Sequence, residues 1–211
     1  GVVFLKGVNL GNWLLIEPYM INAPSSFAGS FESLHTAISS VTGSSANADI
    51  FFSTWYDTFI QKKDIDSIAS MGFNHVRVPF PYHMFYDEDS NTFINTGFIY
   101  LDRVVQWCKQ NNIYAILDLH HAPGGQINTG IWTDFTTSKP ILMQIWKNIA
   151  THYANETAVG GYDILNEPVI ANQSEQWKLK DLYVSITNEI RTVDINHILF
   201  FSKRSNCFLF K

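Results

Sequence analysis

The chain has 211 residues, of which 46% are hydrophobic and 15% aromatic, so it can bury the core of one large domain or of a substantial part of one. A net charge of −5 argues against a nucleic-acid-binding surface, and the sequence holds no apolar run long enough to span a membrane. Cys108 and Cys207 are too few for a disulfide framework, and their redox state stays open.

The first half of the chain predicts two strands separated by a helical excursion. In chain order it reads as a strand over 4–10, a loop over 23–49 with a short helix at 31–39, a helix in two pieces over 53–71, a strand over 73–79 and a loop over 82–96. Gly72 is a good helix stop. Pro79 is expected to end the second strand, because proline has no N–H to give to a sheet.

The second half alternates helices and strands. In chain order it reads as a helix over 101–111, a strand over 113–121, a loop over 122–135, a helix over 138–153, a strand over 162–165, a helix over 174–193 and a strand over 197–201. Such an order is typical of a parallel sheet with right-handed crossovers. Residues 7–12 do not fit the glycine-rich phosphate fingerprint, which favours a barrel over a doubly wound sheet.

The predicted fold class is therefore α/β, of the (β/α)8 TIM-barrel type. Five strands occupy the 211 residues, and eight would need roughly 330 residues at the same spacing. We therefore expect one domain over residues 1–211 that is truncated after about five β/α units and lacks its C-terminal part.

The stretch 160–169 is the centre of the functional interpretation. Two glycines at its start are expected to end the preceding helix, and the apolar strand 162–165 then stops on Asn166 and Glu167. The proline that follows should keep Glu167 extended, so that it points as a strand residue does. A carboxyl group at the rim of a buried strand, over an apolar wall that raises its pKa, suits proton transfer. The tripeptide Asn-Glu-Pro is also ordinary turn composition, so a surface turn stays open at this point.

Other polar side chains follow the earlier strands at the rim where a barrel forms its active site: Asn9, Arg77 and His120. Asp118 either orients His120 or pairs with a backbone group. His121 points to the opposite face by strand alternation, so the two adjacent histidines do not form a metal site. Trp132, in a glycine-rich loop, is a candidate platform for a sugar ring.

Four motifs follow one another along the chain: Gly7-Val8-Asn9-Leu10-Gly11-Asn12-Trp13-Leu14 with Glu17-Pro18-Tyr19, then Val76-Arg77-Val78-Pro79, Asp118-Leu119-His120 and Leu165-Asn166-Glu167-Pro168. This combination, between Lys6 and Phe201, resembles glycoside hydrolase family 5, in particular its fungal exo-β-1,3-glucanases. Asn-Glu-Pro alone is not specific, but the four motifs in this order are.

The resemblance implies a retaining β-glycosidase of β-glucan, a glucan exo-β-1,3-glucosidase, on a (β/α)8 barrel without a metal or cofactor. Glu167 would be the acid/base, and Asn166 would hold the 2-hydroxyl of the sugar at the cleavage subsite. The other implied site residues are Arg77 and His120 in the polar layer of the site and Glu17 and Tyr19 at the terminal sugar. The family's nucleophile is a Glu at the end of the seventh strand, beyond the five predicted here, so this chain alone is expected to be inactive.

Two further interpretations stay open: a non-catalytic carbohydrate-binding or inactive remnant of the family, and an endo-β-1,4-glucanase. Exo or endo action and the linkage depend on loops that the sequence does not decide. The expected partner is a β-glucan oligo- or polysaccharide, and the complete protein is expected to be a monomer. Glycosylation sequons at Asn155 and Asn172 support a secreted or cell-wall protein.

Overall fold

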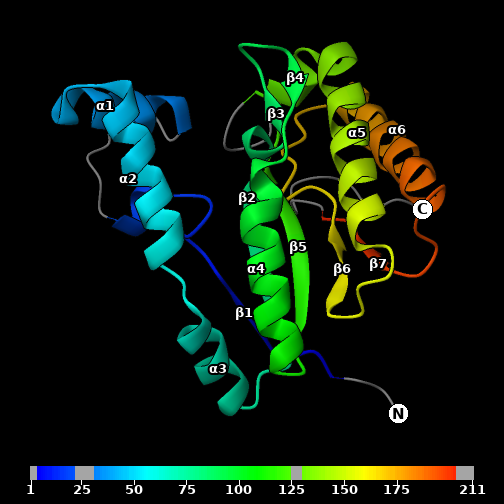
Figure 1. Cartoon of the computed structure of the whole chain (residues 1–211). Helices are drawn as coiled ribbons and strands as arrows, with labels where there is room; N and C mark the ends of the chain where they lie inside the picture. The colour runs from blue at the N-terminus through cyan, green and yellow to red at the C-terminus, as the bar shows by residue number, and fades with distance from the viewer. Residues whose placement is uncertain (1–3, 22–30, 125–129, 203–211) are drawn as a thin grey trace.

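A five-stranded, all-parallel sheet forms the centre of the computed structural model, which describes residues 4–21, 31–124 and 130–202 (Figure 1). Its strands, in sheet order, are β1 Gly7–Asn9, β2 His75–Pro81, β5 Tyr114–His121, β6 Val159–Asp163 and β7 Ile198–Phe200. Neighbours in the sheet follow one another along the chain without a reversal of order, as in a (β/α)8 barrel. The predicted fold class is confirmed.

Helices connect the strands along one side of the sheet (Figure 1). They are α1 Phe31–Thr42, α2 Ser45–Thr58, α3 Lys62–Ser70, α4 Thr96–Gln110, α5 Phe135–Tyr153 and α6 Gln173–Arg191. Short elements complete the chain: the 3-10 turns η1 Pro18–Ile21, η2 Tyr82–Met84 and η3 Gly130–Trp132, and the hairpin β3 Tyr86–Asp87 with β4 Thr92–Phe93. Among the described residues, no helix combines the length and apolar character needed to cross a bilayer. Cys108 is a buried free thiol, and Cys207 lies outside the described residues.

The two faces of the sheet differ in burial. On β2, Val76, Val78 and Phe80 face the helices and are fully buried. Arg77 alternates with them and turns to the other face, where its side chain is 25% exposed. The sheet therefore presents polar strand residues on the face that the helices leave open.

The prediction that Pro79 ends the second strand is wrong, because β2 continues to Pro81. The carbonyl of Arg77 accepts a hydrogen bond of 2.9 Å from the N–H of Leu10, so residue 77 turns its backbone groups toward β1. Residues 79 and 81 face the same way, because a strand has a period of two. β1 pairs with β2 only as far as Arg77, so the two prolines cost the sheet no ladder bond.

The paired glycines lie inside β6 and do not end a helix, contrary to the prediction. β6 also starts earlier and ends earlier than the predicted strand over 162–165. Gly161 has a φ of 154°, and a Cβ at this position would lie 2.5 Å from the carbonyl oxygen of Ile198 on β7. Glycine is required here because the neighbouring strand comes so close.

The helical excursion before β2 is longer than predicted. α1 and α2 occupy most of the later part of the stretch 23–49, which the sequence predicted to be mainly loop. Ser44 fixes the start of α2 by accepting a hydrogen bond of 3.1 Å from the N–H of Asn47. Residues 22–30 of the predicted loop lie outside the described part of the chain.

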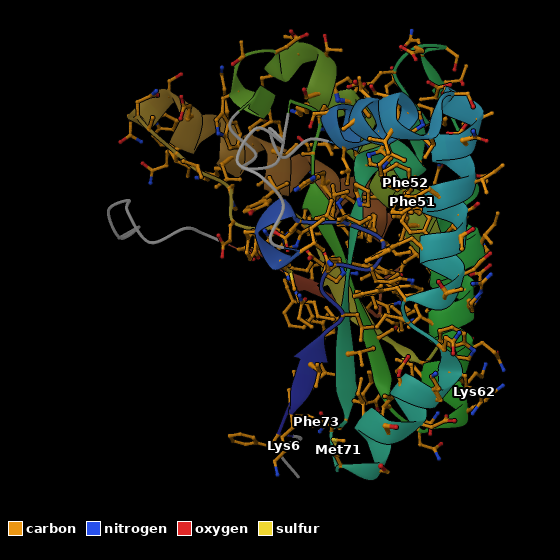
Figure 2. All side chains as sticks on the ribbon, turned by 90° about the vertical axis from the view of Figure 1, so that its left-hand side faces the viewer. Lys6, Phe51, Phe52, Lys62, Met71 and Phe73 are labelled. Atoms are coloured by element: carbon orange, nitrogen blue, oxygen red, sulfur yellow. The ribbon has the colours of Figure 1, made fainter. Side chains whose placement is uncertain are left out.

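The predicted helix over 53–71 consists of two pieces, α2 and α3, as expected. Figure 2 shows Phe51 and Phe52 projecting from α2. Phe52 is 4% exposed and lies on the buried side of the helix, whereas Phe51 is 39% exposed. At the lower end in Figure 2, the carbonyl of Lys6 accepts a hydrogen bond of 2.9 Å from the N–H of Asn74, which aligns the starts of β1 and β2.

Two histidines lie beneath the loop that follows β1. His121, the last residue of β5, is 6% exposed, and the Nε2 atom of His83 on η2 is buried although part of that side chain is accessible. Both line a small cavity with apolar side chains that include Leu14 and Ile16. The pKa of each histidine is lowered to about 3, by burial in both cases and, for His121, also by the charges of the neighbouring histidines.

The low pKa of His121 predicts an acid-sensitive fold. The unfolded chain accepts a proton on histidine near pH 6.5, whereas the folded chain resists it down to about pH 3, so the free energy of unfolding falls as the pH drops through that window. His121 should account for a loss of about 2 kcal/mol between pH 7 and pH 5. Urea unfolding at both pH values should show His121→Gln losing about 2 kcal/mol less than the wild type; equal losses would refute the burial of a neutral His121.

Candidate functional site

The guanidinium group of Arg77 is the hub of a cluster at the C-terminal ends of the strands. It donates to Oδ2 of Asp163 through Nε at 3.0 Å and through Nη2 at 2.8 Å. Nη1 lies 2.9 Å from Oδ2 of Asp118, and Nη2 also donates to Oδ1 of Asn166 at 2.9 Å. One side chain of β2 therefore binds groups from β5, β6 and the loop that follows β6.

The same groups close into a ring. Nδ2 of Asn166 lies 3.1 Å from Nε2 of His120, and Nδ1 of His120 lies 2.6 Å from Oδ2 of Asp118, the atom that Arg77 also contacts. Arginine can only donate, so the oxygen of the Asn166 amide faces Arg77 and its NH2 group faces His120. Nε2 of His120 must then accept the hydrogen bond from Asn166, and Nδ1 must carry the hydrogen that is donated to Asp118.

Asp118 is the buried member of this ring, with a fully buried side chain. Burial raises its pKa to about 6, against the opposite effects of the hydrogen bond from His120 and the charge of Arg77. Above that pH the carboxylate is ionised and accepts from both partners. Its Oδ2 atom makes these bonds, while Oδ1 has no partner within the described residues.

The loop after β1 brings a second carboxylate to the ring. Asn12, at a positive φ of 62°, accepts a hydrogen bond of 2.9 Å from the N–H of Glu17 on its side-chain oxygen and one of 3.0 Å from Nε1 of Trp55 on its carbonyl. Oε1 of Glu17 then lies 3.9 Å from Nε2 of His120, and Oε2 accepts a hydrogen bond of 3.2 Å from the hydroxyl of Tyr19. Predicted separately along the chain, Glu17, Tyr19 and His120 come together here.

The structure corrects the expected setting of Glu167. β6 ends four residues earlier, Glu167 has a φ of 36° and not an extended value, and its side chain is exposed, so no apolar wall covers it. Glu167 is not extended because hydrogen bonds fix the chain before and after it. The N–H of Asn166 donates to the carbonyl of Leu119 at 3.0 Å, and Nε1 of Trp132 donates to the carbonyl of Val169 at 2.6 Å. The chain must turn between these anchors, at a cost of about 1–3 kcal/mol.

Glu167 follows Asn166 directly in the chain, and its charge affects the hydroxyl of Tyr19. The pKa of the Tyr19 hydroxyl is raised, first by partial burial, then by Glu17, and also by the negative charge of Glu167. Two carboxylates and a phenol, from the loop after β1 and the loop after β6, therefore influence one another electrostatically.

Trp132 does not offer the sugar platform that its loop suggested. It is 4% exposed, and both its indole N–H and its carbonyl are bonded, the carbonyl to Nζ of Lys178 at 2.8 Å. Its role in the described structure is to tie the loop after β5 to the loop after β6, which carries Glu167. No group of three or more potential metal-binding side chains is found in the described ranges.

Asp163 is the site residue that the sequence interpretation missed. A signal was available, because a carboxylate inside an apolar strand needs a cationic partner when it is buried. Asp163 pairs in register with Asp118 on β5, and the cation between them comes from the strand on the far side of β5. Asn9 of β1 completes the cluster by accepting from Nη1 of Arg77 at 3.3 Å.

The two-carboxylate cradle of Arg77 predicts that Asp163→Asn lowers the free energy of unfolding by about 1–3 kcal/mol, less than for a fully buried pair because Arg77 is 25% exposed. The matched control is Asp181→Asn, whose side chain is 55% exposed and pairs with Lys139 on the surface. That change should stay within about 0.5 kcal/mol in urea unfolding. Equal effects of the two substitutions would show that the cradle does not hold Arg77.

Comparison with known proteins places these residues in a family. A model of the cellulase family, glycosyl hydrolase family 5, matches residues 34–205. Endoglucanase C of Acetivibrio thermocellus is 34% identical over 94% of this chain and 49% of its own length. A beta-xylosidase of Phanerodontia chrysosporium is 32% identical over 94% of this chain and 42% of its own length. The probable glucan 1,3-beta-glucosidase A of Aspergillus fumigatus is 27% identical over 94% of this chain and 49% of its own length.

Solved structures show the same fold. The rutinosidase from Aspergillus niger has a TM-score of 0.74 and 22% identity, covering 93% of this chain and 61% of that chain. Endoglucanase Cel5A from Thermotoga maritima has a TM-score of 0.64 and 20% identity, covering 93% of this chain and 50% of that chain. The chain spans about half the length of the curated relatives it matches. On the extent of the family match, the chain belongs to the cellulase family, glycosyl hydrolase family 5.

Proposed function

We propose that residues 1–211 are part of one glycoside hydrolase catalytic domain, whose C-terminal part lies beyond them and supplies the nucleophile. The reaction is the retaining hydrolysis of β-glucan, with glucan exo-β-1,3-glucosidase activity as the specific form. The observation that carries the proposal is the closed ring of Arg77, Asn166, His120 and Asp118, with the carboxylates of Glu17 and Glu167 beside it.

In this proposal Glu167 is the acid/base. A retaining glycosidase needs two carboxyl groups about 5–5.5 Å apart, one to protonate the leaving oxygen and one to attack the sugar. The exposure of Glu167 gives a substrate access to it. Arg77 would keep the second carboxylate ionised and therefore nucleophilic.

Asn166 is proposed to bind the 2-hydroxyl of the sugar. Arg77 and His120 fix both ends of its amide, so the group cannot rotate to suit the ground state of the substrate. A preset amide binds best the geometry of the oxocarbenium-like transition state, in which contacts to the 2-hydroxyl strengthen. His120 thus acts through Asn166, and Arg77 acts through Asn166 in addition to its effect on the second carboxylate.

Exo action is supported by the Glu17 and Tyr19 pair. The two side chains bond to each other at one end of the ring, where they can bind the hydroxyls of a terminal sugar. A specific observation favours a second candidate, endo-β-1,4-glucanase: identity to Endoglucanase C is 34%, against 27% to the glucan 1,3-beta-glucosidase A. A third candidate is an inactive, sugar-binding remnant, because the chain matches about half of each relative.

We further propose that the protein is secreted or held in the cell wall, that it needs no cofactor, and that the complete domain is a monomer. The support is chemical: the substrate is a polymer outside the cell, and the two sequons suit a secretory route.

The acid/base role predicts a split between two substrates. In the full-length protein, Glu167→Gln should lower kcat/KM on β-1,3-gluco-oligosaccharides by about 10²–10⁴-fold, because the leaving oxygen receives no proton. An aryl β-glucoside with an acidic phenol needs no such proton, so its first step should change far less, and azide should restore its turnover as β-glucosyl azide. Glu88→Gln, at an exposed hairpin position, is the matched control.

Each outcome decides a separate point. Equal losses on both substrates would remove Glu167 from the acid/base role. Turnover by the 211-residue chain alone would contradict a nucleophile that lies beyond it. Glucose as the first product would support exo action, whereas longer oligosaccharides would support the endoglucanase.

A further inference from the structure

The two sequons of the chain lie at opposite ends of the sheet. Asn155 follows α5 in the turn that leads into β6, at the N-terminal ends of the parallel strands. Asn172 follows β6 and precedes α6, at the C-terminal ends where the ring of Arg77 and the exposed Glu167 are found. The same tripeptide pattern therefore occurs in two different structural settings.

Asn172 is already used as a helix cap. Its side-chain oxygen accepts a hydrogen bond of 3.0 Å from the N–H of Glu175, and its NH2 group donates to Oε1 of Glu175 at 2.9 Å. Oε2 of Glu175 accepts a further hydrogen bond, of 2.6 Å, from the N–H of Ala171. The hydroxyl residue of this sequon, Ser174, is already in the first turn of α6. An enzyme that modifies the amide would have to unwind the start of the helix and break the cap.

Asn155 is presented for modification. Asn155 and Thr157 are exposed, and within the described ranges no hydrogen bond involves the Asn155 side chain. The residue between them holds the turn: Glu156 donates its N–H to the carbonyl of Tyr153 at 2.8 Å, and its carboxylate binds Lys109 at 2.9 Å. With Glu156 anchored, its two neighbours point outward from a turn, the setting in which sequons are used.

We propose that Asn155 is an N-glycosylation site and that Asn172 is not, an inference that rests on the secretory route proposed above. In the transfer, the amide nitrogen of Asn155 bonds to the anomeric carbon of an oligosaccharide carried on a lipid diphosphate. The bond from that carbon to the diphosphate oxygen breaks, the lipid diphosphate leaves with the electron pair, and the amide loses one proton. The glycan then stands at the end of the sheet opposite Glu167, where it does not obstruct a polysaccharide substrate.

The test directs the full-length protein into the secretory pathway of a yeast with a cleavable leader and measures occupancy by mass spectrometry. Glycan release by peptide N-glycosidase in ¹⁸O-water converts each occupied Asn to an ¹⁸O-labelled Asp. The expected result is labelling at Asn155 at least about tenfold above that at Asn172, and loss of the glycan in Asn155→Gln but not in Asn172→Gln. Equal labelling, or labelling at Asn172 alone, would overturn the proposal. If the chain stays inside the cell, the same ratio is read on the retained pool, because the glycan is added there.

Two stability controls separate the cap from the sequon. Asn172→Ser keeps a capping oxygen without placing a second carboxylate against Glu175, and it should leave Tm within about 1 °C, whereas Asn172→Gln should lower Tm by about 2–4 °C. Asn155→Gln, made in unglycosylated protein, should not change Tm. An unchanged Tm in Asn172→Gln would remove the physical reason for excluding that sequon. None of these measurements uses glycosidase activity, so their failure and the failure of the proposed function are distinguishable.

Discussion

The central constraint in this structure is that the guanidinium group of Arg77 needs hydrogen-bond acceptors on every side. Arg77 can only donate hydrogen bonds and stays charged at every accessible pH, so each neighbour must offer an acceptor. Asn9, Asp118, Asp163 and Asn166 do so from β1, β5, β6 and the loop beyond β6. Four segments that are distant in the sequence are thereby held at the same level of the sheet.

The orientation of every other polar group in the ring follows from that requirement. The oxygen of Asn166 must face Arg77, and its NH2 group must face His120. His120 must then donate a hydrogen bond from its Nδ1–H to Asp118. Asp118 and Asp163 place two carboxylates around one guanidinium, and a third carboxylate, that of Glu17, lies 3.9 Å from His120. This excess of negative charge suits a reaction whose transition state carries positive charge on a sugar ring.

Periodicity and strand order carried most of the fold from sequence, because consecutive parallel strands joined by helices leave few arrangements open. The errors came from contacts that only the folded chain reveals. Pro79 does not end β2 because its missing N–H faces a place where β1 has already stopped. Glu167 is not extended because bonds to Leu119 and Trp132 fix the chain on both sides of it. Asp163 escaped notice because its partner lies two strands away in the sheet.

The tautomer of His120 tests the closed ring most directly. Long-range ¹H–¹⁵N correlation spectra of the histidine rings at pH 8 distinguish a protonated from an unprotonated ring nitrogen, and His120→Gln assigns the signal. The ring requires a proton on Nδ1, bonded to Asp118, and a bare Nε2 that accepts from Asn166. A proton on Nε2 in its place would mean that the Asn166 amide is reversed or unbound, and the account of how Arg77 orders this site would fail.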